Sequence, residues 1–179
     1  MLGFALFDTA LGTAAVVWRD DVIVGVELPH AEPARTRSPV LRYHPDAVES
    51  QPPPAVARAV RRMTALLQGE SDDLRDVEVD LSGLAPFQRQ VYEFVRTIPP
   101  GQAMTYGQVA EAVGAPGSAQ AVGQAMGHNP VPIVVPCHRV VAAGGRLGGF
   151  SAPGGATTKR RMLTIEGADL PDTQPALFD

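Results

Sequence analysis

The first thirty residues alternate between short β-rich runs and turn residues. The runs Phe4–Asp8, Gly12–Arg19 and Val22–Leu28 are rich in strand-forming side chains. Leu11-Gly12 and Asp20-Asp21 separate them and predict two hairpin turns. The chain is therefore expected to begin with an antiparallel sheet.

A different period follows in residues 55–68. Their apolar side chains recur at helical spacing, at Val56, Val60, Met63, Leu66 and Leu67. Gly69 suits the C-terminal cap of this helix. Residues 29–54 are rich in Pro, Arg, Ser and Glu without a sustained period, which predicts a loop. The run Val77–Leu81 predicts one more strand.

After Ser82-Gly83 the pattern becomes helical, so this dipeptide is the predicted domain junction. Pro86 is a plausible first-turn residue of a helix that runs to Ile98, where Pro99-Pro100-Gly101 ends it. The buried stripe of this helix is expected at Phe87, Val91, Phe94, Val95 and Ile98.

Two shorter helices are predicted next, joined by a Gly-Ala-Pro-Gly turn as in a helix-turn-helix. Thr105 is expected to cap Tyr106–Val113, and Ser118 to cap Ala119–Gly127. The outward face of the second helix is small and polar, with Gln120, Gly123, Gln124 and Gly127. Such a face favours minor-groove or shape binding over base readout by long basic side chains. A plain helical hairpin is the alternative.

These elements predict an α+β protein with a small N-terminal antiparallel sheet and a helix, followed by a mostly helical C-terminal domain with a helix-turn-helix. The expected N-terminal domain covers residues 1–82, and the second domain, whose helix-turn-helix makes it the candidate for DNA binding, covers 83–170. Residues 171–179 are expected to form an acidic, flexible tail.

Charge is distributed unevenly between these parts. Residues 1–82 contain eight Arg and thirteen Asp or Glu, whereas residues 83–168 contain seven Lys or Arg and three Glu. The net charge of −4 alone argues against a nucleic-acid partner, but a basic second half can bind a polyanion while the acidic half faces away. Chance clustering is the alternative explanation.

The composition excludes several classes of protein. A single cysteine rules out an internal disulfide and argues against a structural zinc site. No two of the four histidines have metal-ligand spacing, so no metal site is expected. No apolar run reaches the ~20 residues of a membrane helix, and the first residues lack the features of a signal peptide. The sequence therefore predicts a cytoplasmic protein without membrane association.

The cysteine lies in the segment Pro136-Cys137-His138-Arg139-Val140, directly after a short apolar run. A lone cysteine is most often a small buried hydrophobe. A thiol attacks only as the thiolate, and an adjacent histidine can take its proton if a carboxylate orients the ring. Glu166, at the predicted end of a helix, is a candidate for that carboxylate.

At this point the chain resembles the active-site domain of the O6-alkylguanine-DNA alkyltransferases. The resemblance covers residues 86–168, about half of the chain. The segments that carry it occur in the family's order: Pro86-Phe87-Gln88, Val91-Tyr92, Ile98-Pro99, Gly101, Thr105-Tyr106-Gly107, Ala121-Val122-Gly123, Ala125, Asn129-Pro130, Pro136-Cys137-His138-Arg139-Val140 and Glu166-Gly167. The Pro-Cys-His-Arg-Val core is the most specific of them.

The resemblance implies catalytic roles for five residues. Cys137 is the expected nucleophile and alkyl acceptor. His138 takes its proton through a water, and Glu166 holds the His138 tautomer. Tyr106 hydrogen-bonds guanine N3 and assists departure of the guanine anion. Asn129 braces the turn before the active-site segment.

It also implies residues that contact the substrate and the DNA. Backbone atoms of Cys137 and Val140 are expected to hold the exocyclic amine of the base, with Arg139 beside them, and Ser151 to donate near guanine O6. The expected DNA contacts share the helix-turn-helix: Thr105, Ala119, Gln120, Ala121, Gly123 and Gln124.

The sequence departs from the family pattern at two places. Gln120 stands where family members usually carry the Arg that replaces the flipped base in the stack, so weaker DNA binding or slower flipping is expected. Phosphate contacts are then expected from Arg146, Lys159, Arg160 and Arg161, although the last three can also be a solvated helix face. The segment after Phe150 is longer than the family's usual lid.

The resemblance predicts a monomer that binds double-stranded DNA containing O6-alkylguanine through the minor groove and that reacts once without a cofactor. Three alternatives stay open: a binding protein that flags alkylated bases without transfer, a transcriptional sensor of alkylation, and a thiol protease. Cys137 argues against the first, since such relatives lack the cysteine. A transcriptional sensor would normally need an additional DNA- or metal-binding segment, which the sequence does not show. The chemistry of a thiol protease would not use the helix-turn-helix.

Overall fold

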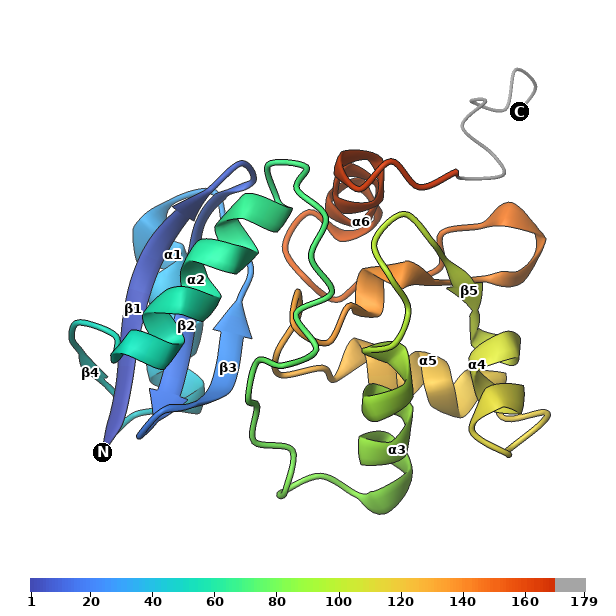
Figure 1. Ribbon diagram of the computed structural model, residues 1–179, viewed down its shortest axis with the longest axis horizontal. Coiled ribbons are helices and arrows are strands. Elements are labelled where there is room, and N and C mark those ends of the chain that lie inside the picture. Colours follow the sequence, from blue (N-terminus) through green and yellow to red (C-terminus); the bar gives the residue numbers. More distant parts are fainter. Residues whose placement is uncertain (170–179) are drawn as a thin grey trace.

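The computed structural model describes residues 1–169, and the predicted tail at 171–179 lies outside them. The N-terminal half consists of β1 (Leu2–Thr9), β2 (Gly12–Arg19), β3 (Val22–Glu27), α1 (Pro33–Tyr43), β4 (Val48–Glu49) and α2 (Pro54–Leu66). The C-terminal half consists of α3 (Pro86–Val95), β5 (Met104–Thr105), α4 (Tyr106–Ala112), α5 (Ala119–Gly127), η1 (Cys137–Arg139), β6 (Val140–Val141), η2 (Ala143–Gly145) and α6 (Gly155–Ile165). The predicted α+β class is confirmed (Figure 1).

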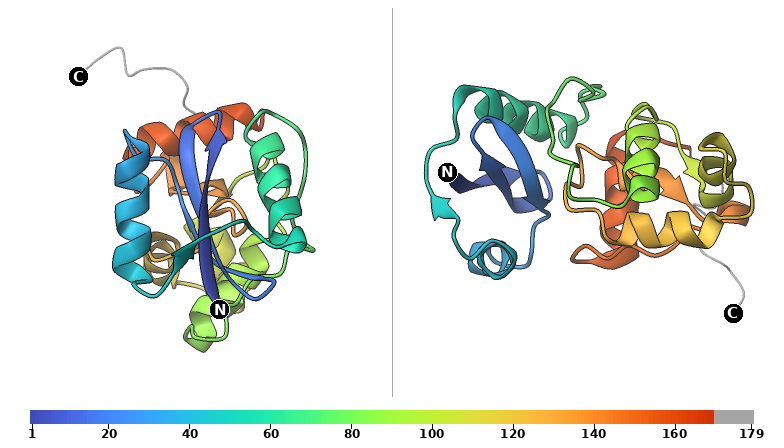
Figure 2. Two further views of the ribbon diagram at one scale, coloured as in Figure 1. Left: turned by 90° about the vertical axis from the view of Figure 1, so that its left-hand side faces the viewer. Right: turned by 90° about the horizontal axis from the view of Figure 1, so that it is seen from below.

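The N-terminal sheet has the strand order β3-β2-β1-β4. Its first three strands pair antiparallel as predicted, and β4 adds a short parallel pairing to β1, so the sheet is mixed. Helices α1 and α2 lie on opposite faces of this sheet (Figure 2). Successive side chains of β2 point to opposite faces of the sheet. Val17 packs in the small cluster that contains Val40 of α1, whereas Val16 packs in the main core that contains Met63 of α2.

The prediction of a loop over residues 29–54 is wrong for its middle part, where α1 forms. Pro33 occupies the first turn of this helix, where its missing N–H costs nothing. Its buried stripe contains Thr36, Pro39 and Val40. Only one of these is a strongly apolar residue, so the periodicity was too weak to detect. The Thr36 hydroxyl donates to the carbonyl of Thr13 and ties the helix to the sheet.

The predicted strand Val77–Leu81 is also not formed as such. Only Val79 forms an isolated parallel bridge, with Ile23 of β3. The amide of Ile23 donates to the carbonyl of Glu78, and the amide of Asp80 donates to the carbonyl of Ile23. The segment therefore covers the edge of β3 rather than extending the sheet as a full strand.

In the C-terminal half, α4 and α5 form the predicted helix-turn-helix. Thr105 caps α4 with a full capping box, since its side chain accepts from the Gln108 amide and the Gln108 side chain accepts from the Thr105 amide. Ser118 occupies the N-cap position of α5, but its side chain makes no capping hydrogen bond, so that prediction is corrected.

One hydrophobic core joins the two halves. It contains side chains of the N-terminal sheet and of α2 together with those of α3, α4 and α5, and it includes Cys137. Within residues 1–169, no helix is long and apolar enough to cross a membrane.

Candidate active site

The nucleophile candidate Cys137 begins the 3-10 turn η1, and β6 follows that turn directly. The two-residue strand β6 pairs parallel with β5, which brings Val141 opposite Thr105. Because Tyr106 follows Thr105, this pairing places the start of α4 beside the cysteine turn. Sequence patterns did not predict this pairing, because two-residue strands have no detectable period.

Asn129 holds the segment before Cys137 in a compact turn. Its side-chain amide donates to the carbonyl of Val135 at 2.8 Å, and its side-chain oxygen accepts from the amide of Val131 at 3.0 Å. The amide of Cys137 in turn donates to the Val135 carbonyl at 2.8 Å. The expected bracing by Asn129 is thus made of specific hydrogen bonds.

The two residues that follow Cys137 belong to a buried charged network centred on Glu166. Oε1 of Glu166 is 2.7 Å from Nε2 of His138 and accepts from Nη2 of Arg139 at 2.8 Å. Oε2 accepts from Nε of Arg139 at 2.9 Å, and Nη1 of Arg139 donates to the carbonyl of Ile98. One carboxylate therefore binds an imidazole and a guanidinium that are both about 1 % exposed. Nδ1 of His138 is buried without a hydrogen-bond partner among the described residues.

This environment moves the pKa values of the three groups in different directions. Burial raises the pKa of the Cys137 thiol, against smaller lowering effects of an Asn129 hydrogen bond and of the Lys159 charge. Burial lowers the pKa of His138 and favours its neutral imidazole, against the raising effect of Glu166. Burial alone would raise the pKa of Glu166, but hydrogen bonds from His138 and Arg139 prevail and lower it to about 2.

Cys137 lines an open cleft of about 660 Å³ at the end of α5. The other residues of its wall come from α4, α5 and the segment before α6: Tyr106, Ala119, Gln120, Gly123, Gln124, Met126, Gly127, Gly149, Phe150 and Ser151. The small, polar face of α5 and Cys137 thus line the same cavity. A thiol in this position can attack a ligand carbon that enters the cleft.

Comparison with known proteins identifies the family of this chain. A methylated-DNA–protein-cysteine methyltransferase of Mycolicibacterium paratuberculosis is 38% identical over 181 residues, which cover all of both chains. This chain belongs to the methylated-DNA–protein-cysteine methyltransferase family. The family model for the DNA-binding domain of 6-O-methylguanine DNA methyltransferase matches residues 86–168.

Solved methyltransferase structures share the fold as well. The O6-methylguanine methyltransferase of Mycobacterium tuberculosis is 34% identical, with a TM-score of 0.74 over all of both chains. The M. tuberculosis OGT in complex with DNA is 31% identical, with a TM-score of 0.72 over 92% of each chain.

The methyltransferase cleft contains seven of the predicted site residues: Cys137, Tyr106, Ser151, Ala119, Gln120, Gly123 and Gln124. His138 and Glu166 do not line the cleft and are hydrogen-bonded to each other beside it in the buried network. Thr105 and Ala121 do not line the cleft, and the Thr105 hydroxyl is engaged in the cap of α4. Val140 is fully buried in the core. Arg139 was expected beside the substrate, but its guanidinium is held by Glu166 away from the cleft.

The expectation that Lys159 contacts phosphate from the surface is wrong. Its side chain is 1 % exposed, and Nζ lies 3.4 Å from Oη of Tyr106 and 3.4 Å from the carbonyl of Gly149. Nζ also lies 5.6 Å from the centre of the Tyr106 ring and 6.0 Å from that of Phe150. No carboxylate of the described residues forms an ion pair with it. Burial lowers the pKa of Lys159 to about 8.

The spacing of residues along α6 indicates the buried position of Lys159. On α6, Lys159 stands four residues before the buried Leu163, which in turn stands three residues before Glu166. Those intervals put all three on one side of a helix. Arg160 and Arg161 fall on other sides and are exposed, in agreement with their expected surface position. One helix face therefore delivers two charged groups to the site.

Gly148 lies against Tyr106 so closely that no side chain fits there. A Cβ on Gly148 would stand 2.7 Å from Oη of Tyr106, and the residue has a φ of +75°. Only glycine adopts this conformation without strain. The close approach positions the Tyr106 hydroxyl at the wall of the cleft.

We therefore expect Gly148→Ala to displace Tyr106 and to slow reaction at Cys137 about tenfold, since small displacements of reacting groups have effects of that order. The rate of Cys137 modification by an O6-methylguanine oligonucleotide, measured by intact mass, checks this. Gly144→Ala is the matched control, because Gly144 also has a positive φ but a Cβ there meets no atom within 4 Å. Equal rates for the two variants would contradict the steric argument.

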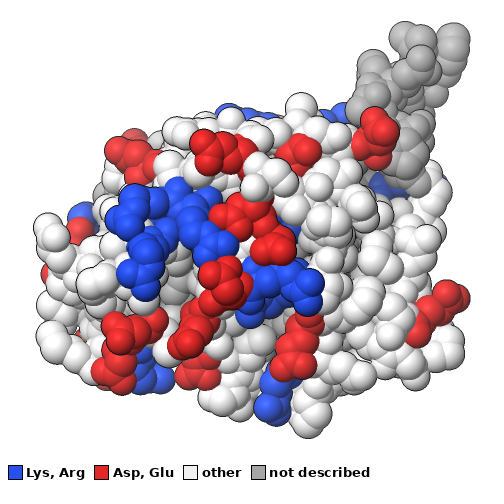
Figure 3. Space-filling view, viewed as in Figure 1, with Lys and Arg blue, Asp and Glu red and all other residues white. Residues whose placement is uncertain are grey.

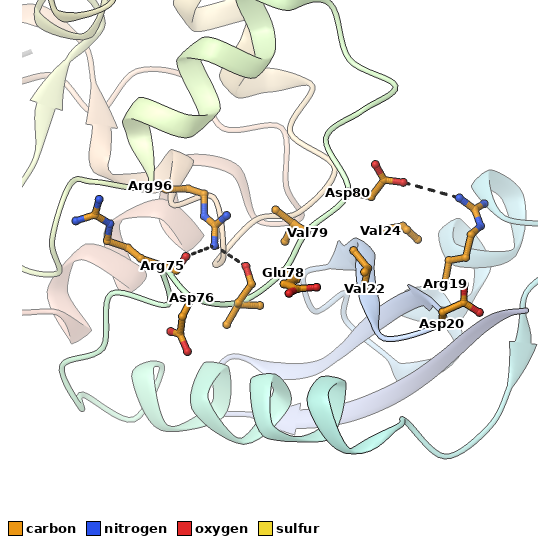
Figure 4. A pocket seen from close by; sticks show the side chains of 11 residues that line it. Arg19, Asp20, Val22, Val24, Arg75, Asp76, Glu78, Val79, Asp80 and Arg96 are labelled. Atoms are coloured by element: carbon orange, nitrogen blue, oxygen red, sulfur yellow. Dashed lines mark hydrogen bonds and ion pairs between the residues drawn. The ribbon is translucent and has the colours of Figure 1, made fainter.

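A second hollow, of about 600 Å³, lies between the β2–β3 hairpin and the segment around residues 75–80 (Figure 4). Its charged side chains are largely engaged with one another or with the backbone. Arg19 lies 3.9 Å from Asp80, and Nη2 of Arg96 donates to the carbonyls of Leu74, Arg75 and Val77. This hollow lies apart from the cysteine, so it is not the catalytic cleft.

Charges on the viewed face gather over the N-terminal half, while the part over α4 and α5 is mostly uncharged (Figure 3). The described residues of α5 contain no Lys, Arg, Asp or Glu. This helix therefore offers shape and polar groups to a ligand rather than fixed charge.

Proposed function

We propose that this protein repairs alkylated guanine in DNA by transferring the alkyl group from guanine O6 to Sγ of Cys137. The observation that carries this proposal is the cavity that Cys137 shares with the outward face of α5. His138, the next residue in the chain, is hydrogen-bonded to Glu166. The S–C bond forms as the bond between O6 and the alkyl carbon breaks. The thioether has no route back, so each molecule acts once.

The thiol proton goes to Nδ1 of His138. Glu166 binds Nε2 of the same ring and thereby leaves Nδ1 as the nitrogen that accepts. No direct Sγ–Nδ1 hydrogen bond is formed within the described residues, and one bridging water completes this path. The imidazolium that results is stabilised by the ionised Glu166.

The leaving guanine carries negative charge, and side chains on the opposite wall of the cleft stabilise that charge. Tyr106 donates toward guanine N3, and the buried ammonium of Lys159 beside it stabilises both this hydroxyl and the thiolate. Ser151, whose hydroxyl now donates to the carbonyl of Gly127 at 2.8 Å, rotates toward guanine O6. Backbone atoms of Cys137 and Val140 hold the exocyclic amine.

A base within a duplex hides its O6 alkyl carbon, so the nucleotide has to leave the stack. Ala119, Gly123 and Gln124 let α5 approach the minor groove closely, and Gln120 fills the space left by the flipped base. Exposed Arg146, Arg160 and Arg161 serve phosphate contacts. We propose that the protein does this as a cytoplasmic monomer.

The deciding experiment incubates the protein with a duplex that contains O6-methylguanine and then weighs it intact. The expected result is a gain of one methyl mass on the peptide that contains Cys137, with one equivalent of guanine restored. Cys137→Ala is the control and should bind the duplex without gaining mass. Binding by the wild-type protein without added mass would support the non-transferring alternative, which the presence of Cys137 in the cleft does not favour.

A further inference from the structure

The edge strand β3 of the N-terminal sheet is hydrogen-bonded to the turn that leads to the nucleophile. The amide of Val26 donates to the carbonyl of Pro130 at 2.9 Å. Pro130 directly follows Asn129, whose side chain holds Val131 and Val135. An edge strand needs a partner for its free backbone groups, and here that partner includes the catalytic turn.

This turn contains a strained residue. Ile133 has a φ of +75° although it is β-branched and 1 % exposed. A β-branched residue in the left-handed region costs on the order of 1–3 kcal/mol and persists only where its surroundings determine it. Four residues later the chain reaches Cys137, so the position of Sγ depends on what holds Ile133 in place.

The surroundings that hold the turn come from both halves of the molecule. Val26 and Leu28 belong to the same continuous core as Val131 and Ile133. The N-terminal half also contacts α6, the helix that leads to Glu166, because the Arg161 side chain donates to the carbonyl of Ala10 at 3.3 Å. The N-terminal sheet therefore touches the elements that bear the thiol and its carboxylate.

We infer that the N-terminal sheet positions the nucleophile: the edge strand β3, through the Val26 amide and its inward side chains, holds the Asn129–Val135 turn in the conformation that aims Cys137 into the cleft. Val26 is thus a positioning residue that acts through Pro130 and the turn. This inference rests on the proposed transfer reaction and gives the N-terminal half a part in it.

The test compares Val26→Ala with Val17→Ala. Both changes remove the same two methyl groups from a buried valine of the same sheet, so they are expected to destabilise the protein similarly. Val26 faces the core shared with the turn, whereas Val17 faces the separate cluster against α1. All rates are measured at a temperature at which circular dichroism shows both variants fully folded.

Two readouts are needed. The first is the rate of methyl transfer from an O6-methylguanine duplex, with the affinity for that duplex measured separately. The second is the pH profile of Cys137 labelling by iodoacetamide, which requires no DNA. For Val26→Ala we expect transfer about tenfold slower, a labelling profile shifted to higher pH, and unchanged duplex affinity. For Val17→Ala we expect wild-type values of all three.

Equal transfer rates and equal labelling profiles for the two variants would overturn the inference, because the sheet would then contribute stability alone. Failure of the proposed function is distinguishable from this result. A wild-type protein that is labelled by iodoacetamide but takes no methyl from DNA would refute transfer, while the labelling comparison would still report how β3 positions the thiol.

Discussion

Glu166→Gln is expected to slow methyl transfer about 100-fold and to lower the free energy of unfolding by about 3 kcal/mol. The carboxylate accepts three hydrogen bonds, one from His138 and two from Arg139. A neutral amide of the same shape has one acceptor oxygen and directs N–H groups at the other donors. The variant therefore leaves a buried guanidinium without its counter-ion and an imidazole without a fixed tautomer.

The pH dependence of stability separates this account from simple loss of packing. The pKa of Glu166 is lowered from its ordinary 4.5 to about 2 in the folded protein. Its contribution is therefore complete above pH 4.5 and is lost as the pH falls through about 2. The stability difference between the wild type and Glu166→Gln, measured by urea unfolding, should shrink across that window. A constant difference would contradict the electrostatic origin.

Glu93→Gln is the matched control, since Glu93 is an exposed carboxylate of the same half of the chain. It should leave both the transfer rate and the stability unchanged within about 0.5 kcal/mol. If Glu166→Gln transfers methyl at the control's rate, His138 does not need its carboxylate, and the proposed proton path is wrong.

Lys159→Met is expected to slow transfer at least tenfold and yet to stabilise the protein below pH 8. Methionine fills a similar volume without the cost of burying an ammonium that has no carboxylate partner among the described residues. The gain is expected to be on the order of 2 kcal/mol. Loss of the positive charge near Cys137 raises the pKa of the thiol further, so less thiolate is present at neutral pH.

The sign of the pH effect follows from the lowered pKa of Lys159. In the folded protein Lys159 loses its proton near pH 8, and in the unfolded chain near its ordinary 10.5. Below pH 8, burial of the charged Lys159 therefore lowers the free energy of unfolding of the wild type by its full amount. This loss is recovered as the pH rises to 10.5. Melting curves of the wild type and Lys159→Met should converge over this range.

Arg160→Met serves as the control on the neighbouring, exposed position of α6. It should show neither the stabilisation nor its pH dependence. Parallel melting curves of the wild type and Lys159→Met at all pH values would refute a buried ammonium, and an unchanged transfer rate would remove Lys159 from the reaction.

Local patterns determined the elements whose periodicity is strong. The hairpin strands, α2 and the helix-turn-helix were predictable because apolar positions recur at the strand or helix period, and because Thr105, Gly114 and Pro86 mark helix ends. The helix α1 was not, since its buried stripe contains Thr36 and Pro39 and buries little apolar surface.

The candidate chemistry of the site was visible in the sequence as well, because the Pro-Cys-His-Arg-Val segment is specific and a glutamate ends a helix after it. The sequence alone identified Cys137 as the nucleophile candidate, His138 and Glu166 as its candidate assistants, and the small polar face of α5. What only the tertiary structure decided is which side chains meet. Arg139 and Lys159 are both basic and both look exposed in sequence, yet one neutralises Glu166 and the other lies buried beside Tyr106. The link from β3 to the Cys137 turn likewise joins residues more than a hundred positions apart. The physical reason is that desolvation and hydrogen bonding depend on distances between segments remote in sequence, which no local period records.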